Sequence, residues 1–299
     1  MGLPQGVKLG VSPLSWANDV LEDLGADIPL STCLNDAAET GYQGIELGRK
    51  FPRDAAVLGP LLADYGLDLA SGWYSGELAL RGVDEELAAV GRHARLLQAM
   101  GARVMVYGEV AMMAEPDALD QPMSRRVLMS TSDRRAYAER LTRFADALQT
   151  RYGLRLAYHH HLMMVAETYE EVAEIFARSG PELGLLIDTG HAAGAGYAYG
   201  RLISDFGQRI CHIHLKDMRP EVMARVRRGD LSFNAGVRAG MFTVPGDGCI
   251  DFGPLARFVR ESGYQGWLVV EAEQDPAKVP PRPAVTAARE YILSQFVPA

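Results

Sequence analysis

The segment ICHIHLKD, residues 210–217, has the pattern of a β-strand that carries polar side chains on one face. Because side chains alternate along a strand, His212, His214 and Lys216 share one face, opposite the apolar residues between them. Three such groups in a row are costly inside an apolar core, so this face needs a polar cavity or a ligand to contact. The segment therefore predicts a strand that ends at a functional site.

Short apolar runs of this kind alternate with longer amphipathic stretches along the whole chain. Three of the amphipathic stretches have helical spacing, at 84–101, 132–153 and 168–180, and we expect Ser132 to cap the second and Gly153 to end it. The predicted strands are 7–13, 44–48, 67–74, 102–109, 154–161, 183–190, 210–217 and 266–273.

Strands that alternate with helices predict an α/β fold with a parallel sheet, and eight strands are the number that closes a (β/α)₈ TIM barrel. An open doubly wound sheet is the alternative, but no GxGxxG motif follows the first strand. A length of 299 residues with 48% hydrophobic residues suits one large core. We therefore predict a single TIM-barrel domain over residues 1–299.

Two further stretches bear on this barrel. ETGYQGIELG (39–48) and ESGYQGWLVVEAE (261–273) repeat the same order of helix end, Gly-Tyr-Gln-Gly and strand, although one common turn used twice would also explain them. Residues 219–249 are rich in Gly and Arg and lack a regular pattern. We expect them to form a long loop that overhangs the active face of the barrel.

Composition restricts the class of protein. The chain has 30 basic and 38 acidic residues, a net charge of −8, and no basic stripe, so nucleic acid is not an expected partner. Its three cysteines are too scattered for a disulfide framework or a zinc site. No signal peptide or apolar span of about 20 residues is visible, so we expect a cytoplasmic protein that does not enter the membrane.

The histidines and carboxylates follow a common rule of position. Six of the seven histidines lie at or just after the ends of the fifth, sixth and seventh predicted strands. In a parallel barrel these ends meet on one face, which carries the chemistry. Imidazoles and carboxylates without thiolates suit Mn²⁺, Co²⁺, Zn²⁺ or Fe²⁺. The carboxylates placed by the same rule are Glu46, Glu109, Glu167, Asp188, Asp217, Glu271 and Glu273.

These motifs resemble those of the xylose-isomerase-like TIM barrels, a superfamily of sugar isomerases, epimerases, dehydratases and metal-dependent endonucleases. The resemblance covers nearly the whole chain and rests on IDTGH (187–191), HLKD (214–217) and VVEAE (269–273). More narrowly, the chain resembles the inosose dehydratase family of myo-inositol catabolism. That likeness rests on GYQGIELGRKFPRD (41–54), SGWYS (71–75), AYHHH (157–161), FTVPGDG (242–248) and VVEAEQDP (269–276).

The resemblance implies a divalent metal ion, Mn²⁺ or Co²⁺, held by a Glu, Asp, His, Glu set. Asp188, His214 and Glu271 match the last three positions. The chain departs from the pattern at the first position, where His159 stands in place of Glu. We expect Glu167 to fold back as the fourth ligand, since a third carboxylate better balances the ion, with His159 as the alternative.

The resemblance also implies a hydro-lyase that dehydrates 2-keto-myo-inositol, a small polyol ketone, to a diketo product. A keto-sugar or inosose isomerase or epimerase is the alternative, and a metal-dependent binding protein is a third reading. The candidate proton-transfer residues are His159, His161, His191 and Lys216, with Glu271 as a further candidate base. The candidate substrate contacts are Trp16, Asn18, Arg49, Lys50, Trp73 and Tyr74. The sequence leaves the oligomeric state open, a homo-oligomer included.

Overall fold

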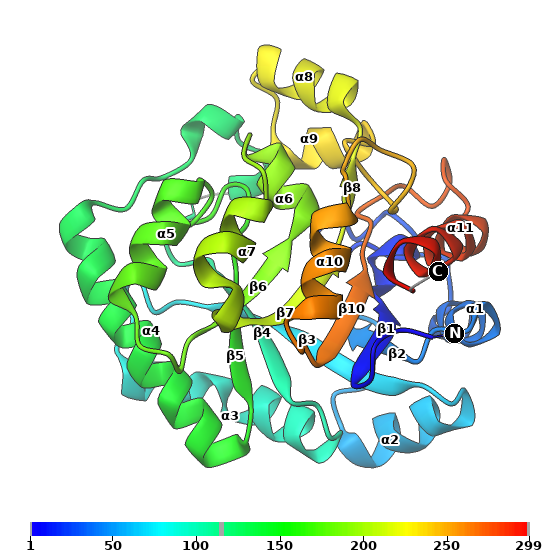
Figure 1. Cartoon of the computed structure of the whole chain (residues 1–299), viewed down its shortest axis with the longest axis horizontal. Coiled ribbons are helices and arrows are strands. Elements are labelled where there is room, and N and C mark those ends of the chain that lie inside the picture. Colours follow the sequence, from blue (N-terminus) through cyan, green and yellow to red (C-terminus); the bar gives the residue numbers. More distant parts are fainter. Residues whose placement is uncertain (1, 114–116, 298–299) are drawn as a thin grey trace.

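The computed structural model describes residues 2–113 and 117–297. Within them, eight parallel strands close into a barrel in the order β1-β10-β7-β6-β5-β4-β3-β2, with helices around it (Figure 1). This confirms the predicted TIM barrel. Its strands are β1 (Val7–Val11), β2 (Gly44–Leu47), β3 (Asp68–Gly76), β4 (Val104–Glu109), β5 (Arg155–His159), β6 (Gly184–Asp188), β7 (Ile210–Leu215) and β10 (Gly266–Val270).

Helices connect the strands and cover the outside of the barrel. α1 and α11 lie side by side near both chain ends (Figure 1). The helices are α1 (Leu30–Thr40), α2 (Ala55–Asp64), α3 (Val83–Ala99), α4 (Thr131–Tyr152), α5 (Tyr169–Arg178), α6 (Thr189–Gly194), α7 (Gly200–Phe206), α8 (Pro220–Arg228), α9 (Phe233–Arg238), α10 (Gly253–Glu261) and α11 (Pro281–Phe296).

Helix ends follow the local sequence closely. The hydroxyl of Ser130 accepts a hydrogen bond from the Asp133 amide at 3.2 Å, so Ser130 caps α4 and the predicted cap Ser132 is wrong by two residues. Gly153 ends α4 at φ 68° as predicted. In the repeated turn, Gly41 and Gly263 both have positive φ, 90° and 73°, which glycine adopts without strain.

The two faces of β7 behave as strand alternation requires. Ile213 and Leu215 point outward into the main core between the strands and the helices. His212 and His214 point inward, where both contact the carboxylate of Glu46 from β2. The register pairs Asp188 of β6 with His214 of β7, so the polar groups of neighbouring strands meet at the same level.

Residues 219–249 are more ordered than predicted. They form α8, α9 and the short antiparallel ribbon of β8 (Asp217–Met218) and β9 (Phe242–Thr243), so the expected irregular loop is wrong. The reason is a small apolar core of their own, in which Val222, Phe233 and Phe242 pack with Leu162. As predicted, the segment covers the active face, because Phe233 lines the cavity there. α8 and α9 stand at the top of Figure 1.

Trp16 ties the loop after β1 to the outer helix layer. Its indole N–H donates to Asp36 Oδ2 of α1 at 2.9 Å, and the side chain is almost fully buried. Asp36 is buried as well, and its other charged partner among the described residues is Arg282, at 3.9 Å. A buried carboxylate oxygen that loses its donor is costly, so this contact stabilises the fold.

We predict that Trp16→Phe lowers the free energy of unfolding by about 1–3 kcal/mol, because the ring packing is kept while the donor to Asp36 is lost. Urea denaturation measures this change. Trp267→Phe is the matched control and should change stability less, since the Trp267 indole nitrogen has no hydrogen-bond partner among the described residues. An unchanged stability in Trp16→Phe would contradict the structural role of Trp16.

Candidate metal centre and active-site cavity

Four side chains from neighbouring strands meet at the carboxyl end of the barrel. His159 ends β5, Asp188 ends β6, His214 lies in β7 and Glu271 directly follows β10. The Asp188 Oδ2 atom lies 3.4 Å from His159 Nε2 and 3.7 Å from His214 Nδ1. His214 Nδ1 lies 2.6 Å from Glu271 Oε2. The structure thus brings together the three ligands predicted at Asp188, His214 and Glu271, with His159 beside them.

The ring of His214 is oriented by Glu46, on the side away from Asp188 and Glu271. Its Nε2 faces Glu46 Oε1 at 3.1 Å, and the same oxygen faces His212 Nε2 at 2.9 Å and accepts from the Ser71 hydroxyl at 2.5 Å. A proton on Nε2 donated to Glu46 leaves the Nδ1 lone pair for the cluster. Carboxylates orient metal-binding histidines in this way in many proteins. His212, one step deeper in the strand, therefore supports the site through Glu46.

This donor set fits a divalent cation. Asp188 Oδ2 and His214 Nδ1 are buried, and within the described part of the chain neither makes a hydrogen bond of good geometry, although Lys216 Nζ lies 3.5 Å from the first and Glu271 Oε2 lies 2.6 Å from the second. The ligand atoms of His159, Asp188 and His214 all lie within 4.8 Å of one another. Buried polar atoms without partners are expensive, and one cation among them would satisfy all of them. Two imidazoles and two carboxylates are donors that such an ion accepts.

The carboxylates of the cluster are held in their charged forms. Burial alone would raise the pKa of Asp188. The nearby Lys216 and histidines lower it by more, so the pKa lies well below its usual range. Burial also raises the pKa of Glu271, but His214 and Lys216 bring it down to about 2. Ionised carboxylates are the form that binds metal.

Glu167, the predicted fourth ligand, does not reach this cluster. Its Oε2 atom accepts a hydrogen bond from the Met163 amide at 2.7 Å and lies 3.5 Å from Arg126 Nε. These contacts hold the carboxylate on the turn that precedes α5. The geometry favours His159, which lies 3.4 Å from Asp188, as the fourth ligand.

Lys216 lies at the centre of a buried charge cluster. Its Nζ is 2.8 Å from Glu271 Oε1, 2.8 Å from Glu273 Oε1 and 3.0 Å from His191 Nε2. Burial lowers the pKa of Lys216, but Asp188 and the two glutamates raise it more, and the net direction is upward. The ammonium is fully buried and does not line the cavity. Lys216 therefore contacts the carboxylates rather than the position of a substrate.

His161 and His191 form a second pair of imidazoles, with ring centroids 3.7 Å apart. Burial lowers the pKa of both rings. His159 and Lys216 lower the pKa of His161 further, and His161 and Lys216 lower that of His191. His161 lines the cavity, whereas His191 lies behind it against Lys216. The ring of Phe233 from α9 stacks on His191 with an interplanar angle of 10°. The pair is thus shielded from solvent yet adjacent to the metal cluster.

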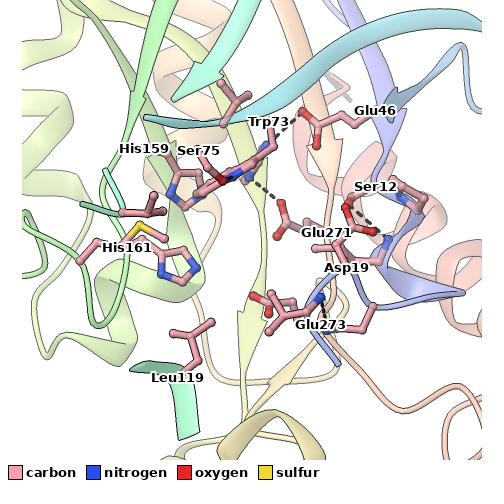
Figure 2. A pocket seen from close by; sticks show the side chains of 18 of the residues that line it. Ser12, Asp19, Glu46, Trp73, Ser75, Leu119, His159, His161, Glu271 and Glu273 are labelled. Atoms are coloured by element: carbon pink, nitrogen blue, oxygen red, sulfur yellow. Dashed lines mark hydrogen bonds and ion pairs between the residues drawn. The ribbon is translucent and has the colours of Figure 1, made fainter. Parts of the chain in front are cut away.

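A cavity of about 210 Å³ opens over these groups. In Figure 2, His159 and His161 lie on one side of it, and Glu46, Glu271 and Glu273 lie on the other. Of the predicted substrate contacts, Asn18 and Trp73 line this cavity. The Trp73 indole donates to Ser75 Oγ at 2.9 Å and meets the ring of His159 edge-on at 5.5 Å.

The other predicted substrate contacts lie outside the cavity, and this corrects the set. Trp16 is bonded to Asp36. Arg49 donates to the carbonyls of Asn18 and Glu22. Lys50 donates to three carbonyls of the loop before α1, at 2.5–3.0 Å. Tyr74 points outward and stacks on His93.

Sequence reasoning missed several lining residues. Ser12 directly follows β1 and Ser75 lies at the carboxyl end of β3, so the position of these two was a usable signal. Asp19, in the loop after β1, and Phe233, from α9, gave none. Two strand-end carboxylates have structural roles instead. Glu109 accepts hydrogen bonds from the amides of two loops, and burial raises its pKa to about 7. Asp217 accepts from three amides, those of Met218, Gly246 and Ile250.

Comparison with known proteins agrees with this architecture. Residues 34–295 match the family model described as xylose isomerase-like TIM barrel. Rhizopine catabolism protein MocC of Rhizobium meliloti is 43% identical over 275 residues, which cover 92% of this chain and 84% of that protein. Inosose dehydratase of Geobacillus thermodenitrificans (strain NG80-2) is 37% identical over 287 residues, which cover 96% of each chain.

A solved structure shares the fold. The IOLI protein with a bound zinc atom superposes with a TM-score of 0.70, and the match covers 97% of this chain and 98% of that one. Because the sequence identity is 17%, this likeness concerns the fold alone. Among the described residues, no helix combines the length and the apolar character that crossing a membrane requires.

We predict that His159→Ala weakens binding of a divalent metal by about tenfold or more, because it removes one of four donors. Titration of the metal-free protein, followed by calorimetry, measures the affinity. His93→Gln is the control, since His93 lies outside the barrel against Tyr74 and should leave the affinity unchanged. An unchanged affinity in His159→Ala would exclude His159 from the metal centre.

Proposed function

Because this chain belongs to the xylose isomerase-like TIM barrel family and, within it, to the inosose dehydratases, we propose that it is a metal-dependent hydro-lyase. Its proposed reaction removes water from 2-keto-myo-inositol and yields a diketo product, in myo-inositol catabolism. The observation that carries the proposal is the convergence of His159, Asp188, His214 and Glu271 beside His161, in one cavity.

The proposed cofactor is Mn²⁺ or Co²⁺, held by His159, Asp188, His214 and Glu271. A divalent ion at this position supplies Lewis-acid polarisation of a ketone, which makes the neighbouring C–H more acidic. A set of two nitrogens and two carboxylate oxygens without thiolate supports these ions over a structural zinc site.

Dehydration requires that one proton leave carbon and that one proton reach the departing hydroxyl. His161 is the side chain best placed for the first transfer. Its Nδ1 is fixed on the Leu162 carbonyl at 2.6 Å, which leaves Nε2 for the cavity. The Nε2 lone pair of a neutral His161 ring can accept a proton from a substrate in the cavity. In this proposal His161, once protonated, gives the proton to the departing hydroxyl, which leaves as water, so the two transfers balance. His191 and Lys216 lie directly behind this ring and complete the buried polar cluster around it.

Charge in the cavity supports a neutral substrate. Among the described residues, no lysine or arginine lines the cavity, whereas Asp19, Glu46, Glu271 and Glu273 do. A phosphate or carboxylate on the substrate would have these groups as neighbours and no cationic side chain as a partner. A polyol ketone offers only hydroxyls, which Ser12, Asn18 and Ser75 are placed to bind, while Trp73 gives an apolar wall for its ring.

Two other functions share these features. An isomerase or epimerase acting on a keto-sugar or inosose also begins with removal of a proton beside a ketone, and it would give a product of unchanged mass. A role in rhizopine catabolism is the second candidate, because the relative at 43% identity has that role. Both retain the metal centre and the cavity described above.

We predict that 2-keto-myo-inositol incubated with the Mn²⁺- or Co²⁺-loaded protein yields a product lighter by one water. Mass spectrometry of the reaction mixture measures this loss. Treatment with EDTA should abolish the reaction, because the polarising ion is removed, and added Mn²⁺ or Co²⁺ should restore it. A product of unchanged mass would instead establish the isomerase alternative.

We also predict that a ketose phosphate neither reacts nor competes with 2-keto-myo-inositol, since the cavity wall offers the phosphate no cationic side chain. Inhibition of the dehydration by increasing ketose phosphate measures the competition. The same ketose without its phosphate is the matched control and should bind more tightly. Tighter binding of the phosphate form would refute a site for neutral substrates.

A further inference from the structure

The turn between β5 and α5 is held in a strained conformation. Met163 has φ 70°, a left-handed backbone that a residue with a side chain rarely adopts. Such a conformation costs of the order of 1–3 kcal/mol and persists only where the surroundings impose it. Within the turn, the His161 amide donates to the Ala166 carbonyl at 3.1 Å. This strain indicates that the position of the turn serves a purpose.

The main chain of the preceding residue, Leu162, contacts both imidazoles of the buried pair, His161 and His191. Its carbonyl lies 2.6 Å from His161 Nδ1, and its amide lies 3.3 Å from His191 Nδ1. The distance between the two rings, 3.7 Å from centroid to centroid, therefore depends on where this main chain lies.

Glu167 and Arg126 hold that main chain from outside. Glu167 Oε2 accepts from the Met163 amide at 2.7 Å and faces Arg126 Nε at 3.5 Å. Arg126 also donates to the Met164 carbonyl at 3.1 Å and to both oxygens of Glu171 at 3.0 Å. The exposed fractions of the Arg126 and Glu167 side chains are 10% and 16%, so solvent screens this pair only in part.

We propose that Glu167 is a positioning residue that fixes the orientation of His161 and His191 through the main chain of Met163 and Leu162. The inference rests on the proposed function, in which His161 transfers a proton. It adds to that function a residue, Glu167, that positions the proton-transfer group. A carboxylate is suited to this task because it accepts the Met163 amide and pairs with Arg126 through the same atom. Its effect on the reaction is indirect, since the Glu167 side chain does not line the cavity.

The test compares three variants of the full-length, metal-loaded protein. Glu167→Ala removes the acceptor and the charge. Glu167→Gln removes the charge but keeps an amide oxygen that can accept from Met163. Glu170→Ala is the matched control, because Glu170 lies three residues further along, in the first turn of α5, but is exposed, and among the described residues its ion pair is with Arg201 at 3.6 Å.

In kinetics with 2-keto-myo-inositol, Glu167→Ala should lower kcat by roughly tenfold to a hundredfold, because a displaced proton-transfer group is inefficient. KM and the bound metal per chain should stay as in the unaltered protein. Glu167→Gln should recover most of the lost kcat, and Glu170→Ala should match the unaltered protein. A loss of metal in Glu167→Ala, or a normal kcat, would overturn the proposal.

A second readout does not depend on turnover. In ¹⁵N-histidine NMR of the substrate-free protein, the Nδ1–H signal of His161 reports its hydrogen bond to Leu162. This signal should shift in Glu167→Ala and stay in place in Glu170→Ala. A shift without any turnover by the unaltered protein would support the positioning role while rejecting the proposed substrate, whereas an unmoved signal in Glu167→Ala would overturn the positioning role itself.

Discussion

Closure of eight parallel strands into a barrel brings all of their carboxyl ends to one rim, and the site depends on this constraint. Asp188 and His214 are 26 residues apart in the chain, yet strand register places them directly opposite each other. The result is a carboxylate oxygen that faces two imidazoles and an ammonium inside the protein. A buried group of this charge density is stable only when each charge has a partner.

Side chains and main chain from several elements around the rim hold this cluster in place. Glu46 orients His214 from the floor of the barrel, and Lys216 balances Glu271 and Glu273 from the side. On the outer side, the turn after β5 fixes the imidazole pair through Leu162. Above them, the ring of Phe233 from α9 contacts both His161 and His191. Each of these groups comes from a different element, so the whole barrel contributes to the precision of the site.

Periodicity in the sequence was enough to predict the fold and the positions of Asp188, His214 and Glu271, because strand alternation and strand ends are local properties. The same reasoning failed for side chains in loops. A count of charges favours Glu167 over His159 as the fourth ligand, but it does not include a partner such as Arg126 from a distant segment. Lys50 looks like a substrate contact in sequence, but the loop carbonyls that it satisfies become visible only in three dimensions.

The most direct test of the central claim is a crystal structure of the protein loaded with Co²⁺, with the ion located by its anomalous scattering. The account predicts one peak at the carboxyl end of the barrel, in contact with His159, Asp188, His214 and Glu271. A peak beside Glu167 would contradict it. So would a peak at either of the two other groups of side chains with metal-binding geometry among the described residues, which are His161, His191 and Glu273, and Glu46, His212 and His214.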